Sequence, residues 1–244
     1  MQSEQLIRQL QDGSIRGLIF DFDGTLLDIA QPLRNSIKEV FEKYKVVSDM
    51  ETTIQEIGAL METIQGYPLP KIILQSYDMF KYISSLNSLT FMKQIEIAAK
   101  IFSRYLTLAK EAPIFPNADN ILKKLNKSHD LYIVSHNQTK NIIEHLEKHE
   151  LMSLFKGVYG ADLLPELKPD PNSLKPVFDN YKSSKLKEFV MIGDMPSDII
   201  AGVEAGVWTI AVTTGVSNRG VLSEQGPSLV IDSLSELIKI TEKK

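Results

Sequence analysis

The chain has 244 residues, of which 43% are hydrophobic and 24% charged, as is ordinary for a globular protein with one large domain or a core plus an insert. Its net charge of −4 favours neither nucleic acid nor an anionic membrane as a partner, and no apolar run approaches the ~20 residues of a membrane span. The lack of cysteine excludes disulfides, thiolate metal sites and cysteine nucleophiles. Because the N-terminus also lacks the hydrophobic stretch of a signal peptide, we expect a cytoplasmic protein.

The first predicted elements are a short amphipathic helix that ends near Gly13 and a buried strand over residues 18–20, followed by the acidic stretch DFDGTLLD. Alternate residues of an extended chain point the same way, so Asp21 and Asp23 should project side by side. Gly24 then lets the backbone turn away from the strand. Two carboxylates this close repel unless a proton or a cation lies between them, and Mg²⁺ suits oxygen ligands best. The sequence therefore predicts a metal site at the end of the first strand.

From residue 29 to residue 112 the apolar pattern is purely helical. Helices are expected near residues 33–44, 51–65, 70–86 and 90–110, which together form an all-helical insert of about four helices. We expect aromatic and methionine side chains such as Phe91 and Met92 to lie in the core of this bundle. In the Gly/Pro-rich turn at residues 66–70, Tyr67 is a candidate substrate contact, and a plain helix-to-helix turn is the alternative.

After Pro113 strands and helices alternate. Expected strands cover residues 131–134, 155–160, 189–192, 208–212 and 229–231, and expected helices cover residues 117–127, 139–150, 170–181, 197–205 and 234–240. This alternation is typical of an α/β fold with a doubly wound parallel sheet covered by helices on both faces. We therefore predict a core domain of residues 1–28 and 113–244 and an inserted helical domain of residues 29–112.

Polar residues follow several of these strands. Ser135 ends the strand at residues 131–134, Lys168 lies in a Pro-rich turn, and Asp194 and Asp198 follow the strand at residues 189–192. Taken singly, these residues have ordinary structural interpretations: a loop serine, a surface lysine, a helix cap and a carboxylate in the first turn of a helix.

Taken together, the motifs resemble the haloacid dehalogenase superfamily. The stretch DFDGTLLD is similar to its first motif, in which DxDGT marks the phosphatases. Ser135, Lys168 and the stretch GDMPSD of residues 193–198 resemble the second, third and fourth motifs, in the expected order and with similar spacing. The tail that begins GDMPSDIIAGVEAGVWTIAVTTG resembles the phosphoglycolate phosphatase-like branch. The resemblance covers the core but not the insert, and it implies a Rossmann-like core with a helical cap inserted between the first and second motifs.

The resemblance also implies a reaction. It suggests a Mg²⁺-dependent phosphatase that acts on a small phosphorylated metabolite, for example phosphoglycolate. Asp21 would form an aspartyl-phosphate and Asp23 would act as general acid and base. Ser135 and Lys168 would hold the phosphoryl group. Mg²⁺ would be bound by Asp21, the backbone carbonyl of Asp23 and Asp194, with Asp198 in support. Thr25 is expected to organise the turn through a side-chain hydrogen bond.

The second motif departs from the branch pattern of Thr or Ser followed by Asn, because here Ser135 is followed by His136 and Asn137. His136 is either a substrate contact or a solvated loop histidine, and the solvated histidine is favoured. A phosphomutase or a pyrophosphatase remains an alternative activity. A dehalogenase is disfavoured by Asp23, and a non-enzymatic switch module that carries an aspartyl-phosphate is disfavoured by the length of the chain and the insert. The sequence predicts neither the specific substrate nor the oligomeric state.

Overall fold

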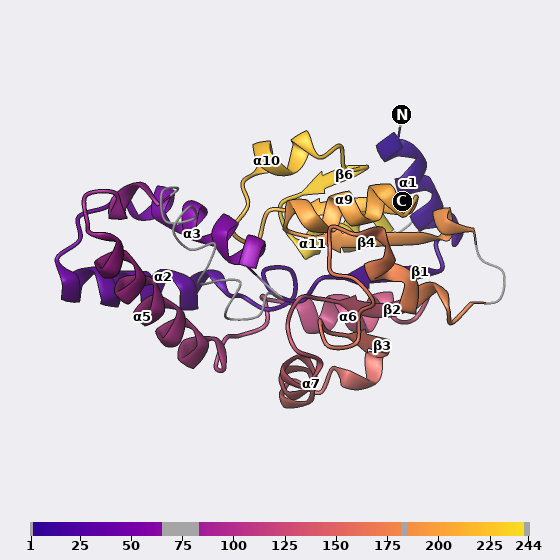
Figure 1. The fold of residues 1–244 in the computed structure, drawn as a ribbon. Coiled ribbons are helices and arrows are strands. Elements are labelled where there is room, and N and C mark those ends of the chain that lie inside the picture. The colour runs from indigo at the N-terminus through magenta and orange to yellow at the C-terminus, as the bar shows by residue number, and fades with distance from the viewer. Residues whose placement is uncertain (1, 65–82, 182–184, 242–244) are drawn as a thin grey trace. The chain divides into compact units, whose positions relative to one another are not determined.

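The computed structural model describes residues 2–64, 83–181 and 185–241 (Figure 1). The chain forms two compact units, one made of Met1–Leu27 with Ile114–Lys244 and the other of Asp28–Pro113. Tyr67, and the part of the expected helix at residues 70–86 that precedes residue 83, lie outside the described residues. No helix in the described ranges is both long enough and apolar enough to cross a membrane.

The larger unit is built on a six-stranded, all-parallel sheet with the strand order β3-β2-β1-β4-β5-β6. Its strands are β1 (Gly17–Phe20), β2 (Asp130–Val134), β3 (Phe155–Tyr159), β4 (Phe189–Gly193), β5 (Trp208–Val212) and β6 (Leu229–Ile231). Each corresponds to a strand expected from the apolar runs of the sequence. The predicted α/β fold with a doubly wound parallel sheet is confirmed.

Helices cover this sheet because its strands are apolar on both faces. The helices are α1 (Gln2–Asp12), α6 (Ala118–Leu125), α7 (Thr139–Lys148), α8 (Lys175–Phe178), α9 (Pro196–Glu204), α10 (Arg219–Glu224) and α11 (Leu234–Thr241), with short 3₁₀ turns η2 (Met152–Leu154), η3 (Pro171–Leu174) and η4 (Leu186–Glu188). On one face Ile19, Tyr132 and Met191 pack with Leu174 and Val177 from η3 and α8. Helix α9 packs on β4 and β5, and the two ends of the chain meet where α1 packs against α11 (Figure 1).

Two helices differ from expectation. The helix expected over residues 170–181 is two short pieces, η3 and α8, because Pro176 lacks the N–H that a continuous helix needs at that position. Helix α10 was not predicted; the Asn218 side chain accepts a hydrogen bond from Val221 N at 3.0 Å and caps it.

The smaller unit contains α2 (Ala30–Tyr44), α3 (Met50–Ile64), η1 (Ser84–Leu86) and α5 (Phe91–Ala109). Helices α2 and α5 pack on each other, and both bury apolar residues. An ion pair of 2.6 Å between Arg104 of α5 and Glu39 of α2 links their surfaces. The side chain of Met92 is 74% exposed, so the expectation that it lies in the bundle core is wrong.

Candidate active site

The candidate site lies at the carboxyl edge of the sheet, where the strand order changes direction. From β1 the sheet continues to β2 and β3 on one side and to β4, β5 and β6 on the other. Asp21 follows β1 and Asp194 follows β4, and the Asp21 N–H donates to Ile192 O at 2.8 Å. Open α/β sheets bind ligands at such switch points, because the loops there diverge and leave a crevice.

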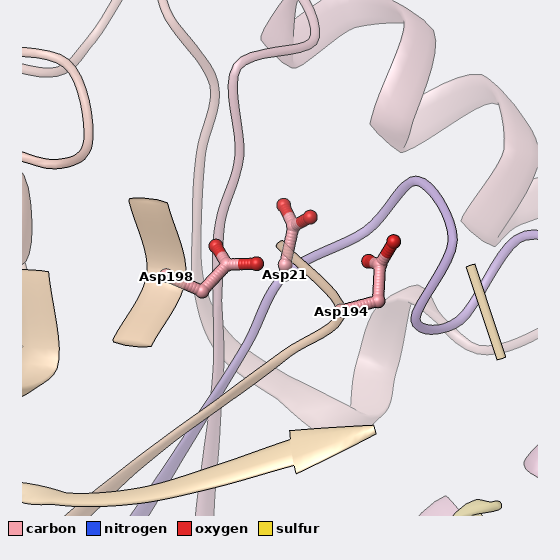
Figure 2. Close-up of side chains that lie close together, drawn as sticks. All are labelled: Asp21, Asp194 and Asp198. Carbon is pink, nitrogen blue, oxygen red and sulfur yellow. The ribbon is translucent and has the colours of Figure 1, made fainter. Parts of the chain in front are cut away.

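Three carboxylates meet at this edge. Asp21, Asp194 and Asp198 each offer an oxygen, and these oxygens all lie within 4.8 Å of one another (Figure 2). All three side chains are buried. Asp194 Oδ1 accepts a hydrogen bond of 2.9 Å from Thr25 Oγ1, whereas Oδ2 is buried without a hydrogen-bond partner in the described residues. The Asp194 oxygen that accepts no hydrogen bond and the two neighbouring carboxylates together form a set of oxygen ligands that fits a hard divalent cation.

Glycines make room for these carboxylates. A Cβ atom on Gly24 or on Gly215 would overlap Asp194 Oδ2, and a Cβ on Gly193 would overlap the carboxylate of Asp198. Gly24 also has a φ of +79°, which lets the chain turn off β1. The loop after β5 is tied to this turn, because Thr214 Oγ1 donates to Gly24 O at 2.7 Å.

Lys168 places a cation beside the cluster. Its Nζ donates to Asp21 Oδ1 at 2.8 Å, to Asp198 Oδ1 at 2.5 Å and to Val134 O at 3.1 Å. The side chain is buried, so a surface lysine is excluded. Burial lowers the pKa of Lys168, but the charges of Asp198 and Asp21 outweigh burial and hold that pKa above its ordinary value. The amine therefore stays protonated at neutral pH.

Asp194 and Asp198 differ in their partners. Burial raises the pKa of Asp198, and the Lys168 ammonium opposes this shift. Its Oδ2 accepts a hydrogen bond of 3.0 Å from Met195 N, so Asp198 both pairs with Lys168 and caps α9. Burial, followed by the charges of Asp21 and Asp198, raises the pKa of Asp194 well above its ordinary value. Thr25 does form the expected hydrogen bond, but to the distant Asp194 rather than within its own turn.

Asp23 is half-buried at the same edge. Its Oδ2 accepts a hydrogen bond of 2.9 Å from Asn137 Nδ2. Burial, followed by the charge of Asp21, raises the pKa of Asp23 from 3.8 to about 7, and the Asn137 hydrogen bond and Lys168 oppose that rise. A carboxyl group with a pKa near neutrality exchanges a proton readily in both directions.

The turn after β2 supplies Ser135 and His136. Ser135 is buried, its N–H donates to Tyr159 O at 3.0 Å, and its Oγ accepts from Asn137 N at 3.2 Å. His136 is only 9% exposed, so the interpretation as a solvated loop histidine is wrong. Burial and the Lys168 charge lower the pKa of His136 to about 4, which leaves the ring neutral at pH 7.

Most of the candidate residues named from the sequence thus lie at one edge of the sheet, and Tyr67 lies outside the described residues. Three residues of this edge were not among the candidates from the sequence: Asn137, Thr214 and Gly215. For Thr214 and Gly215 a signal was present, because Thr-Thr-Gly follows the buried run of β5 directly. The hydrogen bond from Asn137 to Asp23 spans 114 positions and has no local signal.

The chain is similar to known proteins along most of its length. The family model described as haloacid dehalogenase-like hydrolase matches residues 18–212. The chain belongs to this family. A phosphoglycolate phosphatase of Vibrio parahaemolyticus is 27% identical over 93% of this chain and 96% of its own length. One of Pseudomonas fluorescens is 25% identical over 94% of this chain and 81% of its own length.

A crystal structure from Haemophilus somnus, described as a predicted phosphoglycolate phosphatase, superimposes with a TM-score of 0.69 at 20% identity and covers 94% of this chain and 99% of that one. The structural likeness supports the fold. Family membership and the curated relatives show that the chain is an enzyme, a hydrolase of the phosphatase type.

Proposed function

We propose that this protein is a Mg²⁺-dependent phosphatase that hydrolyses a small phosphate monoester through an aspartyl-phosphate on Asp21. The observation that carries the proposal is the pairing of the Asp21 carboxylate with the Lys168 ammonium, next to a buried Asp194 oxygen that has no hydrogen donor in the described residues. Phosphoglycolate is the first candidate substrate, because the curated relatives that match nearly the whole chain carry that name.

The residues that would hold the metal are Asp21 and Asp194, together with the backbone carbonyl of Asp23 and with Asp198 in a supporting role. Asp194 Oδ2 is the best placed ligand, because it is buried and accepts no hydrogen bond from the described residues. Bound Mg²⁺ would supply positive charge that screens these carboxylates from the phosphoryl group. Asp198 supports the site mainly through Lys168, since both of its oxygens already accept hydrogen bonds.

In the first chemical step an Asp21 oxygen attacks phosphorus and the P–O ester bond breaks. The bonding electrons pass to the leaving oxygen, which takes the proton of Asp23, so the product leaves as an alcohol. In the second step water attacks the phosphorus of the aspartyl-phosphate and gives its proton to Asp23. The P–O bond to Asp21 then breaks, which releases phosphate and restores the carboxylate. A pKa of about 7 allows Asp23 to act as acid in the first step and as base in the second.

The remaining polar side chains hold the transferred group. The Lys168 ammonium orients Asp21 and offsets charge on the phosphoryl oxygens. Ser135 offers a hydroxyl at the end of β2, next to β1 in the sheet. His136 is proposed as a substrate contact that stays neutral above about pH 5, since its pKa is about 4.

We propose that the helical unit of residues 29–112 selects the substrate. It is inserted in the chain between Asp21 and Ser135, as a cap domain of this family would be, and Tyr67 is its proposed contact. In Tyr67→Ala, kcat/KM should change unequally across a panel of phosphate esters, because a contact with the leaving group stabilises some esters more than others. A uniform change, or none, would assign Tyr67 to structure.

A panel of small phosphate esters, assayed with and without Mg²⁺ for wild type and Asp21→Asn, tests the function. We expect phosphate release that is lost on chelation, restored by Mg²⁺ and lost in Asp21→Asn, because an amide cannot form the acyl-phosphate. Transfer to a sugar hydroxyl in place of phosphate release would indicate a mutase. Phosphate release that is indifferent to the chelator would contradict the proposed Mg²⁺ dependence.

A further inference from the structure

Both polar atoms of the Asn137 side chain are held by hydrogen bonds. Its side-chain oxygen accepts hydrogen bonds from Gln138 N at 2.8 Å and from Asn141 Nδ2 at 3.1 Å. Because this oxygen faces the start of α7, the amide nitrogen must point the other way, and it donates to Asp23 Oδ2 at 2.9 Å. The orientation of the Asn137 amide is therefore fixed by its neighbours.

The backbone around Asn137 is anchored to the loop after β3. Ala161 N donates to Asn137 O at 2.9 Å, and Gly160 N donates to Thr139 Oγ1 at 2.9 Å. The Asp162 carboxylate accepts from Thr139 N at 2.7 Å and from Thr139 Oγ1 at 2.9 Å. Two loops at the carboxyl edge of the sheet thus hold the Asn137 amide in place.

We infer that Asn137 is a positioning residue that holds the Asp23 carboxyl group in the orientation from which it protonates the leaving oxygen. The inference rests on the proposed function, in which Asp23 is the general acid. Asn137 Nδ2 bonds to one Asp23 oxygen, Oδ2, and leaves Oδ1 to carry and deliver the proton. Proton transfer depends steeply on the position of the donor, so a carboxyl group free to rotate would donate less often.

The test compares two esters that depend differently on the acid. The leaving group of an alkyl ester such as phosphoglycolate is a basic alkoxide, which needs a proton from the general acid. The leaving group of p-nitrophenyl phosphate is a stabilised phenolate, which needs that proton little. The parameter is kcat/KM, which reports the steps up to release of the first product. In Asn137→Ala we expect kcat/KM to fall about tenfold or more for the alkyl ester and clearly less for the aryl ester. A merely structural role would lower both values by the same factor.

Asn137→Asp guards against misfolding, because it keeps the shape of the side chain and the oxygen that accepts from Gln138 N. It replaces the donor by a carboxylate oxygen that repels Asp23 instead of holding it. It should show the same selective loss. Gln138→Ala is the matched control: the Gln138 side chain is exposed and its backbone N–H remains, so both esters should be turned over as by wild type.

Asp23→Asn separates failure of this inference from failure of the proposed function. If Asp23→Asn loses the alkyl ester selectively and neither Asn137 variant does, Asp23 is the acid and Asn137 does not position it. If Asp23→Asn itself shows no selective loss, the acid role is wrong and the inference falls with it. Equal losses on both esters in the Asn137 variants would also overturn the inference.

Discussion

Replacing Asp194 by asparagine in the metal-free protein should raise the melting temperature, although it removes a residue of the candidate site. Oxygens of Asp194, Asp21 and Asp198 lie within 4.8 Å of one another. At an effective dielectric constant of about 20, two like charges at that distance repel by ~3.5 kcal/mol, and the Lys168 ammonium offsets only part of this. The amide oxygen of asparagine can still accept the hydrogen bond from Thr25 Oγ1.

We therefore expect Asp194→Asn to stabilise the metal-free protein in chelator by about 1–3 kcal/mol. Each kcal/mol raises the melting temperature of a protein of this size by roughly 2–4 °C. The assay is thermal unfolding in a chelator. Asp119→Asn, whose side chain is half-exposed and pairs only loosely with Lys123 at 3.9 Å, is the control and should change stability by less than about 0.5 kcal/mol. On addition of Mg²⁺ the order should reverse, because wild type gains the binding free energy and the variant gains less. A variant that melts below wild type in chelator would refute the repulsion argument and assign Asp194 to a structural role.

The pH dependence of this difference gives an independent check on the same reasoning. A carboxyl group whose pKa is raised on folding binds its proton more tightly in the folded state. The stability of the folded state therefore falls as pH rises from the ordinary value of 3.8 towards the folded value, which is about 7 for Asp23 and also raised for Asp194. The stability advantage of Asp194→Asn should be small near pH 4 and should grow as pH rises above that value, because the folded pKa of Asp194 lies well above 3.8. A stability advantage of Asp194→Asn that shrinks as pH rises would contradict the repulsion argument.

Three further changes have distinct expected outcomes. Gly215→Ala should weaken Mg²⁺ binding about tenfold or more in calorimetry, because the added Cβ would overlap Asp194 Oδ2. Gly220→Ala, where the nearest heavy atom is 3.2 Å from the added Cβ, is the control and should bind Mg²⁺ as wild type does. Equal affinities of the two variants would contradict the metal site. Lys168→Met should destabilise the chelated protein by about 3–5 kcal/mol in thermal unfolding, because it leaves buried carboxylates without their cation, and an unchanged melting temperature would refute that pairing. The ring protons of His136 should titrate in NMR spectra near pH 4, and a midpoint above about 6 would show that the ring is not desolvated.

Most of the fold could be predicted from the sequence because its strands are unbroken apolar runs. Runs such as residues 189–192 end at Gly or Asp, and both the burial and the boundary are encoded locally. The long helix expected at residues 170–181 does not form, because Pro176 interrupts the hydrogen bonding of a continuous helix although the apolar spacing favours one. Helix α10 was missed because it has six residues and too short an apolar pattern to detect.

The candidate site divides in the same way. Asp21, Asp23 and Asp194 could be predicted, since each follows an apolar run at the edge where parallel strands end together. The burial of His136 and the contact of Asn137 with Asp23 could not, because both depend on how distant loops pack at that edge. Lys168 could be named only through the family resemblance, because its own turn resembles a solvated loop and its contacts with Asp21 and Asp198 are made by distant residues.

The central claim, an aspartyl-phosphate on Asp21, can be tested directly by trapping. Enzyme quenched in acid during turnover of a phosphate ester is treated with borohydride, which reduces an acyl-phosphate to the alcohol and so converts the phosphorylated aspartate to homoserine. Peptide mass spectrometry then locates the change. The account predicts homoserine at position 21 in wild type and none in Asp21→Asn or in enzyme quenched without substrate. Homoserine at another aspartate, or phosphate release during turnover with no modified residue, would contradict it.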